Sequence, residues 1–217
     1  MKMSIPGLET LQANNIFCIG RNYALHAREM GSDLPEEPMV FLKPNSALIY
    51  NGGTVRIPMQ SGNVHHEVEL VIAIGKKGSN ISLEKADEYI AGVGIGIDMT
   101  ARDLQQNAKS AGHPWTVSKG FDTFAPLGRM VPPEKAGSLG SLTIELKRNG
   151  EIVQQGETSE MIFPVYDLIS RLSEIFTLQP GDLIYTGTPE GVGPVQPGDK
   201  LSARLNDNLS ILNVDVT

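Results

Sequence analysis

Short apolar runs separated by glycines and prolines repeat along the chain, and this pattern predicts many short strands. Strands are expected at residues 15–20, 38–44, 67–75 and 92–98, within 142–156, from 181 into a glycine-rich loop ending at 193, and from 200 to 216. Within 142–156, Asn149 and Gly150 lie between alternating apolar and polar residues, which predicts a hairpin turn. Because hairpins join most of the strands, the pattern favours an α+β fold with a sandwich or rolled barrel over a doubly wound sheet.

Helical periodicity marks a few short segments. Helices are expected at residues 21–31, 82–92, 99–112 and 165–176. Ser82 is the expected N-cap of the second segment, and Gly92 follows its last turn. The third ends at Gly112, and Thr100 and Asp103 have the spacing of a capping box at its start. The fourth carries an apolar stripe made of Val165, Leu168, Ile169, Leu172, Ile175 and Phe176.

Composition and charge narrow the classes of function. The chain has 217 residues, 40% of them hydrophobic, which is enough for one well-buried core within a single domain. Its formal net charge is -7 and it has no basic stripe. Binding to nucleic acid or to an anionic membrane surface is therefore disfavoured.

Cysteine content and the N-terminal sequence bear on the compartment. Cys18 is the only cysteine, so an internal disulfide is impossible, which fits a reducing compartment. The first residues, "MKMSIPGLETLQ", include no apolar stretch of signal-peptide length. No apolar run approaches the ~20 residues that a membrane helix needs. We therefore expect a soluble, cytoplasmic protein.

The stretch "VHHEVELVIAIG" (64–75) places two carboxylates on one face of a predicted strand. Glu67 and Glu69 are two residues apart and point the same way. Buried carboxylates are costly unless the strand end is solvated, a Lys or Arg pairs with them, or they bind a cation. Asp98 ends another predicted strand and adds a third carboxylate, although it could instead cap the following helix. Three carboxylates form an all-oxygen set that suits Mg²⁺, Mn²⁺ or Ca²⁺.

Two histidines precede these glutamates. His65 lies on the same face as Glu67 and Glu69, so these three residues form a rival metal site with a preference for Fe, Mn or Zn. His66 points the other way and is expected to be a structural, hydrogen-bonded histidine.

Seven segments, in order, resemble the fumarylacetoacetate hydrolase family, and more narrowly its short acylpyruvase and oxaloacetate decarboxylase branch. They are "GRNYALHAREM" (20–30), "FLKP" (41–44), "HHEVEL" (65–70), "DMTARD" (98–103), "PWTVSKGFDTFAPLG" (114–128), "GETSEMIF" (156–163) and "GDLIYTGTPEGVGP" (181–194). The resemblance runs from about residue 15 to the C-terminus. It implies a mostly-β mixed sandwich roll with a few short helices, one catalytic domain over 1–217 with 1–14 as an N-terminal segment, and a homodimer.

The resemblance also assigns the metal site. It implies Mg²⁺ or Mn²⁺ held by Glu67, Glu69 and Asp98. The family does not use the position of His65 as a ligand, which weakens the rival site.

Catalytic roles are implied for three further residues. His26 and Glu29 match the family's H-x-x-E segment and would share one face of a helical turn, as such pairs on surface helices often do. Lys119 matches a lysine that the family points into the site. Gly20 and Gly31 bracket the H-x-x-E segment, which suits a lid that orders on substrate binding.

Four residues are expected to bind substrate. They are Arg21, Arg102, Gln105 and Thr188. Arg102 and Gln105 are three residues apart on a predicted helix and can reach one ligand, although solvation of an exposed helix face would explain them as well. Thr188 matches the family's glycine-threonine loop, whose glycines permit close backbone approach.

Taken with the resemblance, these residues predict a hydrolase that acts on C–C bonds in ketonic substances. The expected substrate is a small 2-keto acid: a 3-acylpyruvate, split by hydrolysis, or oxaloacetate, which is decarboxylated. Both reactions would pass through a pyruvate enolate stabilised by the metal. Alternatives are an oxaloacetate keto-enol tautomerase, a fumarylpyruvate hydrolase, or a decarboxylase/isomerase of aromatic catabolism. A non-catalytic, metal-stabilised binding protein is the alternative from another class.

Overall fold

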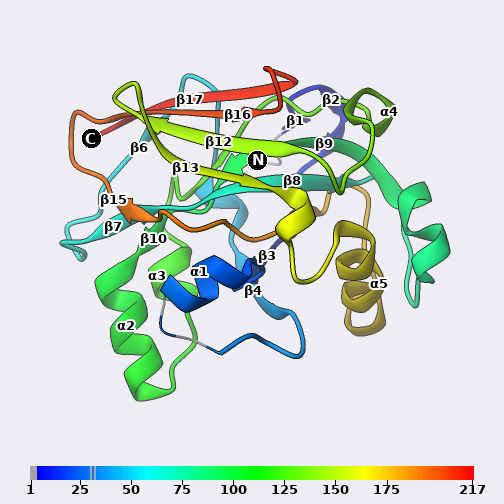
Figure 1. Cartoon of the computed structure of the whole chain (residues 1–217), viewed down its shortest axis with the longest axis horizontal. Helices are drawn as coiled ribbons and strands as arrows, with labels where there is room; N and C mark the ends of the chain where they lie inside the picture. Colours follow the sequence, from blue (N-terminus) through cyan, green and yellow to red (C-terminus); the bar gives the residue numbers. More distant parts are fainter. Residues whose placement is uncertain (1–3, 30, 32) are drawn as a thin grey trace.

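The computed structural model describes residues 4–29, 31 and 33–217 (Figure 1). Its strands are β1 Ser4–Ile5, β2 Leu8–Gln12, β3 Ile16–Gly20, β4 Met39–Lys43, β5 Leu48–Tyr50, β6 Thr54–Val55, β7 Val64–His66, β8 Val68–Ile74, β9 Ile90–Ile97, β10 Thr100–Ala101, β11 Ala125–Leu127, β12 Thr143–Arg148, β13 Glu151–Glu157, β14 Leu183–Tyr185, β15 Gly193–Pro194, β16 Lys200–Leu205 and β17 Ser210–Val216. Its α-helices are α1 Ala24–Glu29, α2 Arg102–Ala111, α3 Thr116–Lys119, α4 Pro133–Ala136 and α5 Val165–Ile175, and its 3₁₀ helices are η1 Asn45–Ala47, η2 Leu83–Tyr89 and η3 Thr158–Glu160.

Two large sheets form the body of the molecule. A seven-stranded mixed sheet has the order β4-β3-β14-β8-β9-β11-β5, and a five-stranded sheet has the order β13-β12-β16-β17-β6. Strands β12, β16 and β17 of the second sheet pack on β8 and β9 of the first, while α1, α2, α3 and α5 gather on the other side of the first sheet (Figure 1). This arrangement confirms the predicted mostly-β mixed sandwich with few helices.

Strand β8 is buried along its whole length because it lies in the middle of the first sheet with layers on both faces. Its antiparallel partner β9 carries glycines at the alternating positions 92, 94 and 96, which allow other groups to come close. Neighbouring side chains occupy the space next to these glycines. A Cβ on Gly94 would lie 2.5 Å from Met130 Sδ, and one on Gly96 would lie 2.6 Å from Tyr185 Cε1. The glycines of β9 therefore serve packing.

Several predicted elements are confirmed. Asn149 and Gly150 have φ values of 55° and 91°, which suit the tight turn of the β12–β13 hairpin. Gly112 ends α2 in the left-handed region, as a C-terminal glycine does. Helix α5 buries the first four residues of its predicted stripe, but Ile175 in its last turn is exposed.

Two helix starts were predicted wrongly. The segment 82–92 forms the 3₁₀ helix η2 and then enters β9, so Gly92 pairs within a sheet and Ser82 makes no side-chain cap. Thr100 pairs in β10 and does not cap α2. Asp103 instead accepts hydrogen bonds from the Ser61 hydroxyl and the Gly62 N–H, at 2.6 and 2.9 Å. In both places strand pairing across the sheet overrides the local capping pattern.

The first predicted helix, 21–31, is shorter in the structure. Helix α1 covers 24–29, and residue 30 lies outside the described residues. Among the helices that the structure describes, none combines the length and the apolar character needed to cross a membrane.

Candidate active site

Three carboxylates meet where β8 and β9 run side by side. Glu67 lies between β7 and β8, Glu69 lies in β8, and Asp98 directly follows β9. The Asp98 N–H donates to the Glu67 carbonyl at 2.8 Å, which continues the antiparallel pairing of the two strands. One ligand oxygen of each carboxylate lies within 4.8 Å of the others, and all three side chains are buried. The structure thus brings together the three predicted metal ligands.

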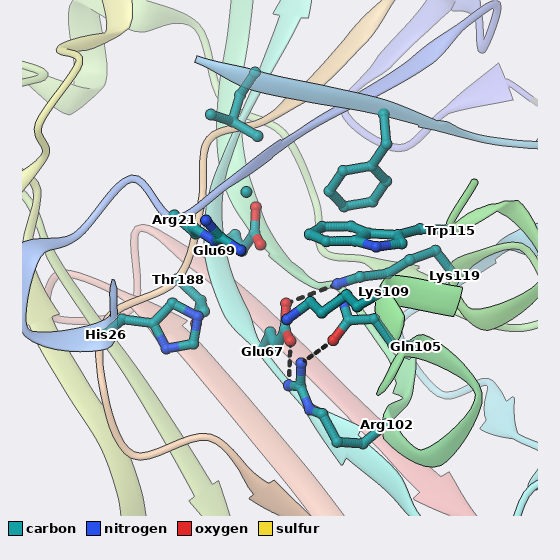
Figure 2. A pocket seen from close by; sticks show the side chains of 13 residues that line it. Arg21, His26, Glu67, Glu69, Arg102, Gln105, Lys109, Trp115, Lys119 and Thr188 are labelled. Carbon is teal, nitrogen blue, oxygen red and sulfur yellow. Dashed lines mark hydrogen bonds and ion pairs between the residues drawn. The ribbon is translucent and has the colours of Figure 1, made fainter. Parts of the chain in front are cut away.

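Two of these carboxylates are paired with cationic side chains. The Lys119 ammonium lies 2.9 Å from Glu67 Oε2 and 2.6 Å from Asp98 Oδ2. Arg102 contacts the other oxygen of Glu67 and lies beside Gln105, as Figure 2 shows. Lys119 comes from the end of α3 and Arg102 from the start of α2, so both helices direct their charge at this cluster.

Glu69 differs from the other two carboxylates. Its Oε2 accepts a hydrogen bond from the Gly187 N–H at 2.7 Å, and no described residue forms an ion pair with it. Burial, followed by the charges of Asp98 and Glu67, raises the pKa of Glu69 well above its usual range. Burial acts on Glu67 in the same direction, but Lys119 and Arg102 outweigh it and hold the pKa of Glu67 well below its usual range. A divalent cation bound by all three carboxylates would offset the charge at Glu69, and an all-oxygen set suits a hard ion. The residues present therefore fit the predicted metal.

Proton release on metal binding follows from the raised pKa of Glu69. At a pH between the usual pKa of a glutamate and the raised pKa in the folded protein, Glu69 carries a proton in the folded metal-free protein that it lacks in the unfolded chain. The stability that this bound proton gives the folded protein is present at low pH and is lost as pH rises through the pKa of Glu69 in the folded protein. A metal ligand must be deprotonated, so at mildly acid pH we expect each bound Mg²⁺ to release up to about one proton. Calorimetry in buffers of different ionisation enthalpy measures this number, and zero protons released would contradict the assignment of Glu69.

His26 and Glu29 form the predicted pair on α1. His26 Nδ1 lies 3.2 Å from Glu29 Oε2, and His26 lines the same pocket as Glu67 and Glu69, whereas Glu29 does not line it. Glu29 Oε1 accepts a hydrogen bond from the Gly191 N–H in the glycine-rich loop, at 3.2 Å. With Nδ1 facing Glu29, the ring keeps Nε2 available for proton transfer. The pair therefore has the arrangement of an imidazole base oriented by a carboxylate.

The residues expected to bind substrate line the same pocket (Figure 2). They are Arg21, Arg102, Gln105 and Thr188. The Thr188 hydroxyl accepts a hydrogen bond from Gln154 Nε2 at 2.9 Å, and Gln154 Oε1 lies 2.8 Å from His66 Nδ1. His66 thus has the structural, hydrogen-bonded role that was predicted, because it fixes the amide that holds Thr188.

His65 does not join the carboxylate cluster. It is not among the metal-ligating groups that the described residues form, and its Nε2 lies 3.0 Å from Asn63 Oδ1. Burial, with Arg102 nearby, lowers the pKa of His65 to about 4, so the ring is neutral at physiological pH. The rival site of His65, Glu67 and Glu69 is therefore wrong. Strand β7 ends at His66, and this break removes the common face that strict alternation predicted.

Sequence reasoning missed several residues at the site. Lys43 is buried with its ammonium 2.6 Å from Asp98 Oδ1, and it donates to the carbonyls of Met99 and Lys119. Phe41, Lys109 and Trp115 line the pocket. A signal for Lys43 was present in "FLKP", because a lysine within an apolar strand needs a buried partner.

Gly187 holds the glycine-rich loop against Glu69. Its φ is 99°, and an added Cβ would lie 2.6 Å from Asn22 Cβ. We expect Gly187→Ala to lower the free energy of unfolding by about 1–3 kcal/mol or more, through backbone strain and this contact. Chemical denaturation measures the loss. Gly62→Ala is the matched control, since no atom would lie within 4 Å of its Cβ. Equal stability of the two variants would contradict the assigned constraint.

Comparison with known proteins agrees with this geometry. Residues 15–217 match the family model described as fumarylacetoacetate (FAA) hydrolase C-terminal. The chain belongs to the fumarylacetoacetate hydrolase family. It is an enzyme of this family, and its fold is that of the family's solved structures.

Family members similar to this chain have several activities in their names. The mitochondrial oxaloacetate tautomerase FAHD1 of Arabidopsis thaliana is 48% identical over 205 residues, which are 94% of this chain and 92% of that protein. The mitochondrial oxaloacetate decarboxylase of Dictyostelium discoideum is 50% identical over 184 residues, 84% of each chain. The crystal structure of fumarylpyruvate hydrolase from Pseudomonas aeruginosa, in complex with Mn²⁺ and pyruvate, superimposes with a TM-score of 0.93 at 41% identity, covering 100% of this chain and 95% of that one.

Proposed function

We propose that this protein is a Mg²⁺- or Mn²⁺-dependent enzyme that cleaves 3-acylpyruvates or decarboxylates oxaloacetate, forming pyruvate as an enolate. The observation that carries the proposal is that two sets of residues lie at one pocket. Glu67 and Glu69 of the buried carboxylate cluster line this pocket together with His26, which Glu29 contacts. A metal-stabilised binding protein would need the cluster but not the pair.

Glu67, Glu69 and Asp98 would hold the ion. A divalent ion there would act as a Lewis acid toward the keto and carboxylate oxygens of a 2-keto acid. Mn²⁺ and pyruvate are named together in the related fumarylpyruvate hydrolase structure, which supports both the metal class and the product class.

Lys119 would supply positive charge where negative charge develops. Its ammonium contacts Glu67 and Asp98 and is almost fully buried. Burial alone would lower its pKa, but Asp98 and Glu67 raise the pKa above its ordinary value, so Lys119 stays charged. A fixed charge in a water-poor site stabilises an enolate more than the same charge in water.

His26 would take the proton of the water that attacks the distal carbonyl of an acylpyruvate. Glu29 would orient the ring through Nδ1 and stabilise the imidazolium that forms. Decarboxylation of oxaloacetate reaches the same enolate by loss of CO₂ and needs no attacking water. Keto-enol interconversion of oxaloacetate passes through a related enolate, and the FAHD1 relatives named oxaloacetate tautomerases favour it as a second candidate.

A side-by-side rate comparison tests the proposal. The substrates are acetylpyruvate, fumarylpyruvate, keto-oxaloacetate and enol-oxaloacetate, each with Mg²⁺, with Mn²⁺ and with a chelator. We expect metal-dependent turnover of at least one of them, and the pattern of rates ranks hydrolase, decarboxylase and tautomerase. Absence of metal-dependent turnover with all four would overturn the proposal. A homodimer and a cytoplasmic location stay predictions.

A further inference from the structure

The pocket carries more positive charge than the carboxylate cluster accounts for. Four of its lining side chains are cationic and two are carboxylates. The cationic ones are Arg21, Arg102, Lys109 and Lys119. Arg102 and Lys119 contact Glu67, but Lys109 and Arg21 have no acidic partner among the described residues. A divalent ion would raise the positive charge further, so the pocket suits a ligand with more than one negative charge.

Lys109 is held at the pocket by an aromatic ring. Its ammonium lies 5.2 Å from the centre of the Trp115 ring, within range of a cation–π contact. Burial, then the charges of Arg21 and Arg102, lower the pKa of Lys109 from its usual range. The side chain comes from the C-terminal part of α2, two turns beyond Arg102, and extends into the pocket (Figure 2).

Arg21 enters the pocket from a different part of the fold. It follows β3, and its φ of 59° lies in the left-handed region, an uncommon conformation for a residue with a side chain. Its Nε is buried and has no hydrogen-bond partner among the described residues. Figure 2 shows Arg21 facing Trp115 from across the pocket that both residues line. A buried guanidinium N–H without a partner is costly, and an anionic ligand would satisfy it.

We propose that Lys109 and Arg21, beside Trp115, form a subsite for a second carboxylate at the distal end of the substrate, so that the enzyme selects dianionic over monoanionic 2-keto acids. The inference rests on the function proposed above, which places the 2-keto carboxylate end at Glu67, Glu69 and Asp98. Lys109 is the specificity-determining residue, because its ammonium lies against the Trp115 ring and forms no ion pair with an acidic side chain among the described residues.

Two five-carbon keto acids test the subsite. 2-Oxoglutarate and 2-oxopentanoate share the 2-keto carboxylate end. At the other end, 2-oxoglutarate has a carboxylate and 2-oxopentanoate has a methyl group. Their dissociation constants are measured by calorimetry on the Mg²⁺-loaded protein. We expect the wild type to bind 2-oxoglutarate about tenfold or more tightly, as hydrogen bonds between charged groups allow. In Lys109→Met the preference should fall to about threefold or less, with binding of 2-oxopentanoate unchanged.

Matched variants and a local probe complete the test. Lys109→Arg keeps the charge and should keep the preference, as should Lys77→Met, which removes an exposed lysine outside the pocket. Trp115 is the only tryptophan, so its fluorescence reports on the subsite. 2-Oxoglutarate should change this emission in the wild type and not in Lys109→Met.

The outcomes separate the two proposals. If Lys109→Met keeps the full preference while both keto acids bind only with metal, the subsite is wrong and the proposed function stands. Unchanged Trp115 emission in the wild type on binding 2-oxoglutarate would also overturn the subsite. If neither keto acid binds in a metal-dependent way, the proposed function fails and the subsite fails with it.

Discussion

Replacing Glu69 with glutamine is expected to abolish metal binding and with it every activity of the enzyme. Glu69 is one of the three carboxylates of the metal cluster, and changes in residues that merely support metal ligands already cost about 10- to 100-fold. We therefore expect Mg²⁺ affinity to fall by roughly 100-fold or more. Hydrolase, decarboxylase and tautomerase rates should fall together, since all depend on the ion. Calorimetric titration with Mg²⁺ and the rates with each substrate measure the effect.

Stability separates this loss from misfolding. Glutamine keeps an oxygen for the Gly187 N–H, and it cannot take on the negative charge that burial, Asp98 and Glu67 disfavour, so metal-free Glu69→Gln should be at least as stable as the metal-free wild type. Mg²⁺ at about 100 times its dissociation constant should stabilise the wild type by about 2.7 kcal/mol and leave the variant unchanged. Glu88→Gln, which breaks only an exposed pair with Lys76, is the control. Wild-type metal affinity in Glu69→Gln would refute the ligand assignment.

Replacing Glu29 with glutamine is expected to separate the activities. The amide has the same shape and still accepts from the Gly191 N–H, but it removes the negative charge that stabilises a His26 imidazolium. Acylpyruvate hydrolysis needs a water to lose its proton, and general-base catalysis contributes about 10²–10⁴-fold. We therefore expect hydrolysis to fall by about 100-fold or more, with oxaloacetate decarboxylation within a few-fold of wild type. Initial rates with the two substrates on one preparation give the ratio.

The matched variant for this test is His26→Gln, which removes the base itself. It should reproduce the selective loss, and Mg²⁺ affinity should stay unchanged in both variants because neither residue belongs to the carboxylate cluster. An equal loss of hydrolysis and decarboxylation in Glu29→Gln would show that the pair has no separate role in activating water.

Much of the metal site could be predicted from two local signals. The spacing of Glu67 and Glu69 showed that they share a direction, and Asp98 stood at the end of the next buried strand. Because β8 and β9 pair antiparallel, the start of one lies beside the end of the other, so the three carboxylates had to meet. The same argument failed for His65, because His65 pairs with Thr100 of β10, whereas the Glu67 carbonyl continues the pairing of β8 with β9.

The residues that sequence reasoning missed depend on tertiary contacts. Lys43 lies 55 positions before Asp98, and only the sheet brings its ammonium to that carboxylate. Nothing in the sequence singled out Lys109, because its place at the pocket depends on Trp115 and Arg21 from other parts of the chain. The 3₁₀ helix η2 shows a similar limit, because its last residues are drawn into β9 by strand pairing that a local pattern does not show.

The most direct test of the account is a crystal structure of the protein with Mn²⁺ and pyruvate, with the ion located by its anomalous scattering. The account predicts one strong peak in the pocket, at coordination distance from Glu67, Glu69 and Asp98, with pyruvate on its open side next to Lys119. A peak bound by other residues, or a pocket that takes up neither ion nor pyruvate when both are saturating, would contradict it.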